Sequence, residues 1–130
     1  MDRATYQRLL DTLVTYDDVH RVAHAEHFDE ELLFVIHTHR VTRDATRRFY
    51  VVKRQMPRIA NQWRHGTRML EIAREWNFPP VLLGQQLLQE LQLPRKKIWS
   101  FFLDPATAPD ERLRREIREL LEHDLIYSPE

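Results

Sequence analysis

The sequence predicts an all-α fold, a multihelical bundle of about seven or eight helices in a single domain, residues 1–130. Apolar residues recur at every third or fourth position along most of the chain, the spacing typical of helices with one buried face. Aspartates and prolines that favour helix starts stand before several of these runs. Only two glycines occur, whereas sheet-rich folds use glycine at turns and bulges.

The first half of the chain is expected to hold four helices. The first covers residues 2–14, and a short second helix begins at residue 17 or 18, since an aspartate at either position can cap it. Asp29 caps the third helix. An apolar repeat extends this third helix to position 56: Val41, Ala45, Phe49, Val52 and Met56. Pro57 breaks or kinks it, and Gly66 closes the fourth helix because glycine tolerates the positive φ of a helix end.

The second half is expected to hold four more helices, beginning with residues 67–76. Asn77 suits a left-handed stop, and the residue before a proline is pushed out of the helical region. The next helix therefore starts at Pro79 or Pro80 and has Leu83, Leu87 and Leu91 on its apolar side. The last two helices follow Pro94 and Asp110.

The formal net charge is zero, but the charges are segregated along the chain. Residues 1–39 carry −5, residues 40–74 carry +8 and residues 75–130 carry −3. A basic middle between acidic ends indicates a directed electrostatic field. Cysteine is absent, which excludes disulfide and thiolate chemistry. No apolar run approaches a membrane span and the start is no signal peptide, so we expect an intracellular protein, cytoplasmic or nuclear, without membrane contact.

The basic middle contains a row of arginines spaced by three, four, seven and four residues: Arg40, Arg43, Arg47, Arg54 and Arg58. A continuous helix would place them on one face together with Tyr50. Like charges at this spacing repel each other by a few tenths of a kcal/mol unless a bound anion neutralises them. The row could hold a phosphate backbone, or it could be a solvated face that pairs with the acidic ends of the same chain.

Residues 67–92 fit a helix-turn-helix hairpin. Ala73 is small enough to let a second helix cross closely, Asn77 suits the turn, and Leu83 falls where the second helix must be apolar. The second helix is expected to expose three glutamines, a residue type that can form paired hydrogen bonds with an adenine edge: Gln85, Gln86 and Gln89. This helix has no Arg or Lys, so a plain hairpin with a polar face is the alternative.

Two further clusters are candidate sites. Arg95, Lys96 and Lys97 lie in the first turn of their helix, where a bound phosphate would relieve the conflict of three cations with the helix dipole. Three histidines share a helical face, but without further ligands surface imidazoles are favoured over a metal site: His20, His24 and His27. No catalytic set, no metal and no cofactor is predicted from the residues.

The order of these features resembles the amino-terminal helical region of the codanin-interacting nuclease family, PD-(D/E)XK nucleases with a TPD domain. The resemblance covers most of the chain and is clearest in the run GTRMLEIAREWNFPPVLLGQQLLQEL, in the FLDP segment of residues 102–105, and in the final Tyr127-Ser128-Pro129. It implies a helix-turn-helix-like region that precedes a nuclease domain. The catalytic Thr-Pro-Asp and Glu-x-Lys signatures of that domain are absent from these residues, so no catalytic residue is assigned.

The resemblance and the charges together predict a non-catalytic domain that binds DNA or another nucleic acid for a nuclease domain in cis or in trans. In this hypothesis the arginine row holds phosphates, Gln85, Gln86 and Gln89 meet the base edges, and residues 95–97 add a second backbone contact. The alternative is a protein-interaction module without a nucleic-acid role. Its basic face would dock onto an acidic partner or onto a second copy, which would make a homodimer.

Overall fold

The computed structural model describes residues 2–126 and is all-helical over that range, which confirms the predicted fold class. The described part contains nine α-helices rather than seven or eight, and two short 3-10 turns, Pro105–Thr107 and Asp124–Ile126. The α-helices are α1 (Arg3–Thr12), α2 (Tyr16–Glu26), α3 (Glu30–Asp44), α4 (Thr46–Arg54), α5 (Met56–Arg64), α6 (Met69–Glu75), α7 (Pro80–Glu90), α8 (Arg95–Leu103) and α9 (Glu111–Glu122).

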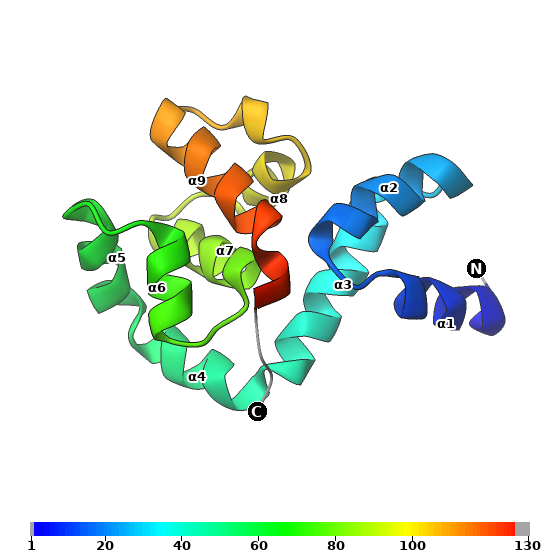
Figure 1. Ribbon diagram of the computed structural model, residues 1–130, viewed down its shortest axis with the longest axis horizontal. Helices are drawn as coiled ribbons and strands as arrows, with labels where there is room; N and C mark the ends of the chain where they lie inside the picture. Colours follow the sequence, from blue (N-terminus) through cyan, green and yellow to red (C-terminus); the bar gives the residue numbers. More distant parts are fainter. Residues whose placement is uncertain (1, 127–130) are drawn as a thin grey trace.

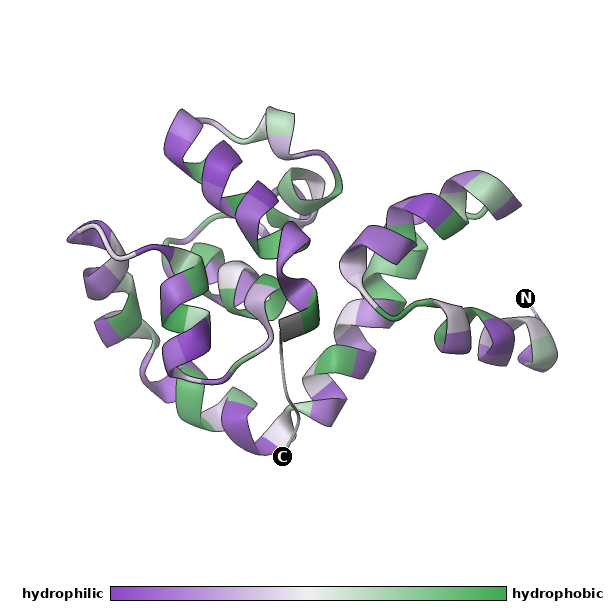
Figure 2. Ribbon diagram, in the orientation of Figure 1, coloured by the Kyte–Doolittle hydropathy of each residue, from purple (hydrophilic) through white to green (hydrophobic). Residues whose placement is uncertain are grey.

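Helix α7 is the central element of the bundle, packed against α3, α5, α6, α8 and α9 (Figure 1). Its residues from Pro80 to Leu88, apart from the half-buried Gln86, are buried. A Cβ on Gly84 would lie only 2.6 Å from Leu120 Cδ1 and 2.8 Å from Phe102 Cζ, so glycine lets α8 and α9 approach α7 closely. In contrast to the buried α7, helix α9 carries many hydrophilic residues (Figure 2).

Several helix ends occur where the sequence predicts them. Asp29 caps α3 by accepting a hydrogen bond from the Glu31 amide, Asn77 has a φ of 46°, and Gly66 has a φ of 107°. The start of α2 differs from the prediction. Its N-cap is Thr15, whose hydroxyl accepts from the Asp18 amide while Asp18 accepts from the Thr15 amide, a capping box that starts the helix at Tyr16.

The predicted continuous helix from residue 29 to residue 56 is wrong. It is divided into α3, α4 and α5 by turns at Ala45 and Gln55. Near the first turn, the Thr42 hydroxyl donates to Thr38 O at 2.8 Å and the Thr46 hydroxyl donates to Arg43 O, and threonines bonded back in this way bend helices. At the second turn, Pro57 has no N–H to continue the ladder.

Candidate nucleic-acid interface

The turns between α3, α4 and α5 divide the predicted arginine row, so it is not one straight row. Arg40 donates to the Leu10 and Leu13 carbonyls and holds the end of α1, and it lies 4.0 Å from Asp44. Arg43 is exposed and lies 3.7 Å from Asp44. The guanidinium of Arg40 is therefore already used within the fold, so the predicted phosphate contact of Arg40 is not supported.

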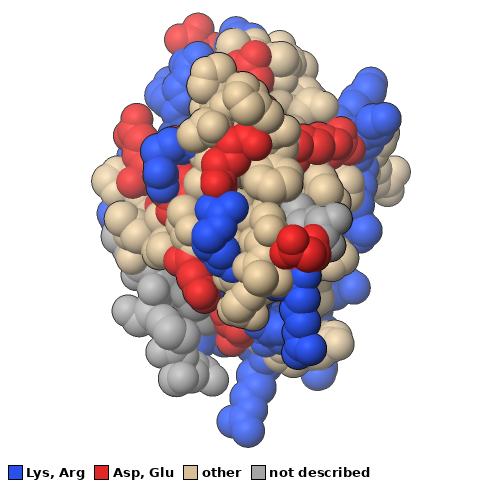
Figure 3. Space-filling model, turned by 90° about the vertical axis from the view of Figure 1, so that its right-hand side faces the viewer, with Lys and Arg blue, Asp and Glu red and all other residues tan. Residues whose placement is uncertain are grey.

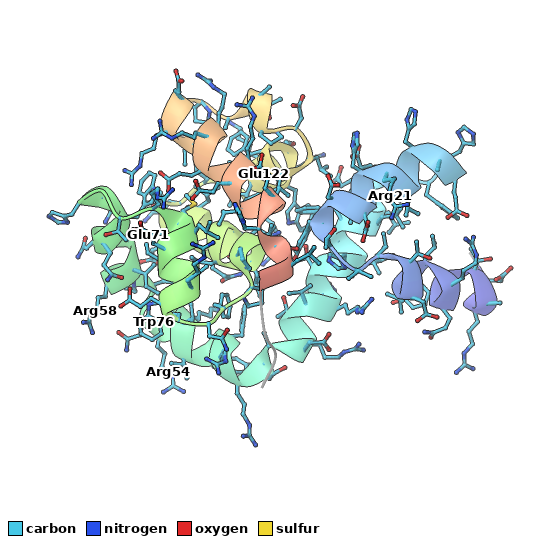
Figure 4. All side chains as sticks on the ribbon, in the orientation of Figure 1. Arg21, Arg54, Arg58, Glu71, Trp76 and Glu122 are labelled. Carbon is cyan, nitrogen blue, oxygen red and sulfur yellow. The ribbon has the colours of Figure 1, made fainter. Side chains whose placement is uncertain are left out.

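The remaining arginines of the row point to solvent. Arg54 and Arg58 project outward from α4 and α5, on the opposite side of the molecule from Arg21 of α2 (Figure 4). Arg47 is also exposed and lines a hollow beside Val51 and Trp76. Within residues 2–126, Arg47, Arg54 and Arg58 form no ion pair. Their charges are therefore not neutralised by any carboxylate of the part of the chain that the structure describes.

A groove of about 400 Å³ lies between four helices. It is formed by the second half of α3, by α4, by the C-terminal half of α7 and by the first turns of α8. We call it the glutamine groove. It brings together members of all three clusters predicted to bind nucleic acid, although Arg43 and Arg95 are 52 residues apart in the chain (95 − 43). Its lining consists of Thr38, His39, Thr42, Arg43, Thr46, Phe49, Tyr50, Gln85, Gln86, Gln89, Arg95 and Trp99.

The sequence predicts that all three glutamines are exposed. This prediction is wrong for Gln85, which is only 2% exposed. Since α7 is covered by neighbouring helices on most of its circumference, Gln85 lies on the floor of the groove, where its amide donates to the Thr38 hydroxyl at 3.5 Å. Gln86 and Gln89 are half-buried, and neither side-chain amide is hydrogen-bonded to another residue within 2–126. Their donors and acceptors are available to a ligand in the groove.

Three aromatic rings line the groove: Phe49, Tyr50 and Trp99. Phe49 and Tyr50 meet edge to face with ring centroids 5.7 Å apart, and Trp99 packs edge to face against Phe34 at 6.4 Å. Lys53 lies over the Phe49 ring, 5.7 Å from its centroid. The sequence alone does not indicate Phe49 and Trp99 as site residues, because apolar rings at helical spacing are ordinarily core residues. Here both are half-buried and line the groove.

The electrostatic character of the groove is cationic. Its twelve lining residues include two arginines, Arg43 and Arg95, and no carboxylate. Lys96 and Lys97 follow Arg95 in the first turn of α8 and are exposed, and no side chain caps this helix start. Figure 3 shows acidic and basic side chains interspersed over the side of the molecule that is on the right in Figure 1, with Lys and Arg projecting along its lower and right-hand margins.

The histidines do not converge. His20 pairs with Glu30, whereas His37 is buried against Tyr16 with ring centroids 4.5 Å apart. Burial, and secondarily the charge of Arg40, lowers the pKa of His37 to about 4, so the imidazole is neutral at pH 7. Among residues 2–126, no three His, Cys, Asp or Glu side chains are placed to hold a metal ion.

In the described range no helix is both long enough and apolar enough to cross a membrane. No protein-family model matches the chain, and neither a curated protein nor a solved structure shows significant similarity to it. The groove and the exposed basic surface are therefore the structural observations that bear on function.

Proposed function

We propose that this chain is a non-catalytic nucleic-acid-binding domain that serves a nuclease domain in cis or in trans. The observation that carries the proposal is that two arginines line the glutamine groove while three exposed arginines of α4 and α5 form no ion pair within residues 2–126. Arg47, Arg54 and Arg58 extend along α4 and α5, and Arg43 and Arg95 stand at the groove itself. The link to a nuclease rests on the family resemblance of the sequence.

Phosphate binding accounts for cations that the fold does not use. Arg47, Arg54 and Arg58 are exposed and have no carboxylate partner within residues 2–126, so their charges are free to meet an external anion. Guanidinium groups bind phosphate oxygens through forked hydrogen bonds, which fix the position of a nucleic acid without reading its sequence. The amides and rings of the groove add groups that are suited to bases.

Fluorescence anisotropy with labelled single strands and duplexes tests the proposal. If four or five phosphates are neutralised, affinity should fall by roughly two decades between about 50 and 200 mM salt. The variant Arg54→Glu/Arg58→Glu should weaken binding at least about tenfold, because two phosphate contacts become repulsive. Arg115→Glu/Arg118→Glu changes the same charge on exposed positions of α9 and serves as the matched control. Equal binding by wild type and both variants would refute the proposal.

A protein-interaction role is the second candidate, and the exposed apolar residues of α4 favour it. Tyr50 and Val51 are 55% and 51% exposed between the arginines of the same helix. An acidic protein or a second copy of the chain could cover this surface through both charge and apolar contact. Light scattering at low and high salt separates the two roles. A dimer that dissociates when Arg54 and Arg58 are reversed, without any nucleic-acid binding, would favour the protein-interaction role.

A further inference from the structure

We propose that the glutamine groove binds one unpaired base of a single-stranded or looped nucleic acid, while arginines at its rim hold the adjoining phosphates. This inference rests on the proposed function and specifies its ligand. It replaces the duplex-reading arrangement expected of a helix-turn-helix hairpin. The reason is the shape of the site, which is a hollow between helices and not a projecting helix.

The glutamines lie too deep to read a base pair within a duplex. A reading helix must enter the major groove, which is about 12 Å wide, with its side chains foremost. Helix α7 is instead the central helix of the bundle, with Gln85 buried and Gln86 and Gln89 half-buried behind α3, α4 and α8. A base can reach these amides only if it leaves its stack and enters the groove.

The groove offers the two contacts that an unstacked base requires. Trp99, Phe49 and Tyr50 supply ring faces or edges, and unpaired bases in nucleic-acid complexes stack on aromatic side chains. Gln86 and Gln89 supply amide donors and acceptors that have no partner within residues 2–126. Such groups can bond the edge of a base that is no longer paired.

The charges around the groove suit a nucleotide and not a neutral aromatic compound. Arg43 from α3 and Arg95 from α8 both line the site, and no carboxylate does. The neighbouring Asp44 lies 3.7 Å from Arg43 in an exposed ion pair, the kind of contact that a phosphate can displace at little cost. The volume of about 400 Å³ lies within the range of small-ligand sites.

The first test compares two ligands that carry the same number of phosphates. One is a labelled single strand of about twelve nucleotides, as DNA and as RNA, and the other is an abasic strand of equal length. A base in the groove predicts at least about fivefold tighter binding of the strand with bases at equal salt, because stacking on a side chain contributes this much or more. Equal binding of both strands would overturn the inference and leave the proposed function intact. Absence of binding to either strand would overturn the inference, and absence of binding to duplexes as well would overturn the proposed function.

The second test removes the amides of the groove. Gln86→Ala/Gln89→Ala should reduce the preference for the strand with bases by roughly five- to tenfold and leave binding of the abasic strand unchanged. Gln7→Ala, which removes an exposed amide from α1, is the control and should alter neither. The strand with bases should also quench tryptophan fluorescence in wild type but not in Trp99→Phe. A preference or quenching that survives these substitutions would place the base elsewhere and refute the inference.

Discussion

Glu116 is at the centre of a buried polar network that joins α5, α6 and α9. Its side chain is 2% exposed. One carboxylate oxygen accepts hydrogen bonds from the Met69 amide at 2.8 Å and from Trp63 Nε1 at 3.2 Å, and the other accepts from Arg112 Nε at 2.6 Å. Because no side chain of α6 caps its own start, Glu116 satisfies the first amide of that helix from a distance of 47 residues.

We predict that Glu116→Ala lowers the free energy of unfolding by about 3–5 kcal/mol, because the Met69 and Trp63 donors lose their acceptor and the partly buried Arg112 loses its ion pair. Arg112 stays in place through its bond to Trp63 O at 2.5 Å and its position over the Trp63 ring, 4.1 Å from the centroid. Its charge then loses the ion pair that it forms within residues 2–126. Glu116→Gln keeps the shape and one acceptor, so we expect a smaller loss of about 1–2 kcal/mol.

The assay is urea unfolding followed by tryptophan fluorescence and far-ultraviolet circular dichroism. The matched control is Glu122→Ala at the end of the same helix, where the carboxylate is exposed, and its cost should be below about 0.5 kcal/mol. A loss below about 1 kcal/mol for Glu116→Ala would contradict the view that this network fixes α6 to α9.

Three further predictions concern stability. Since the pKa of His37 falls from 6.5 to about 4 on folding, stability should drop by up to about 3 kcal/mol as pH falls from 6.5 to 4. Burial raises the pKa of Asp124 to about 6, so its contribution to stability increases as pH falls and opposes that of His37. The urea titrations should therefore use the Asp124→Asn variant. The control is the same variant with His37→Leu added, in which the His37 contribution to the pH dependence of stability should disappear. Gly84→Ala should cost about 1–2 kcal/mol in thermal unfolding, because overpacking against α8 and α9 exceeds the gain in helix propensity. Arg40→Ala should speed amide exchange in α1 about tenfold through loss of two carbonyl contacts, and unchanged exchange would contradict its role at the end of α1.

Helix ends set by local chemistry could be predicted from the sequence. Asp29, Gly66 and Asn77 act on backbone groups within a few residues of themselves, so their residue types alone indicate caps and left-handed turns. The turn at Ala45 could not be predicted in this way. The apolar repeat runs through it unchanged, and the bend depends on which carbonyls the hydroxyls of Thr42 and Thr46 select.

The candidate site was predicted in its parts but not in its arrangement. Glutamine is usually exposed, so Gln85 was expected to face outward, yet its partner Thr38 lies 47 residues earlier on another helix. The groove likewise depends on how α3, α4, α7 and α8 pack together, which no spacing within one helix specifies. Trp99 shows the same limit, because its type indicates burial and only the packing indicates which part of the ring stays accessible.

Amide-shift mapping by nuclear magnetic resonance during titration with a short single strand tests the central claim most directly. The account predicts that shifts concentrate in α4, in the first turn of α8 and in the side-chain amides of Gln86 and Gln89. Shifts that concentrate on α2 and α9, or a spectrum unchanged at saturating concentrations of DNA and RNA, would contradict it.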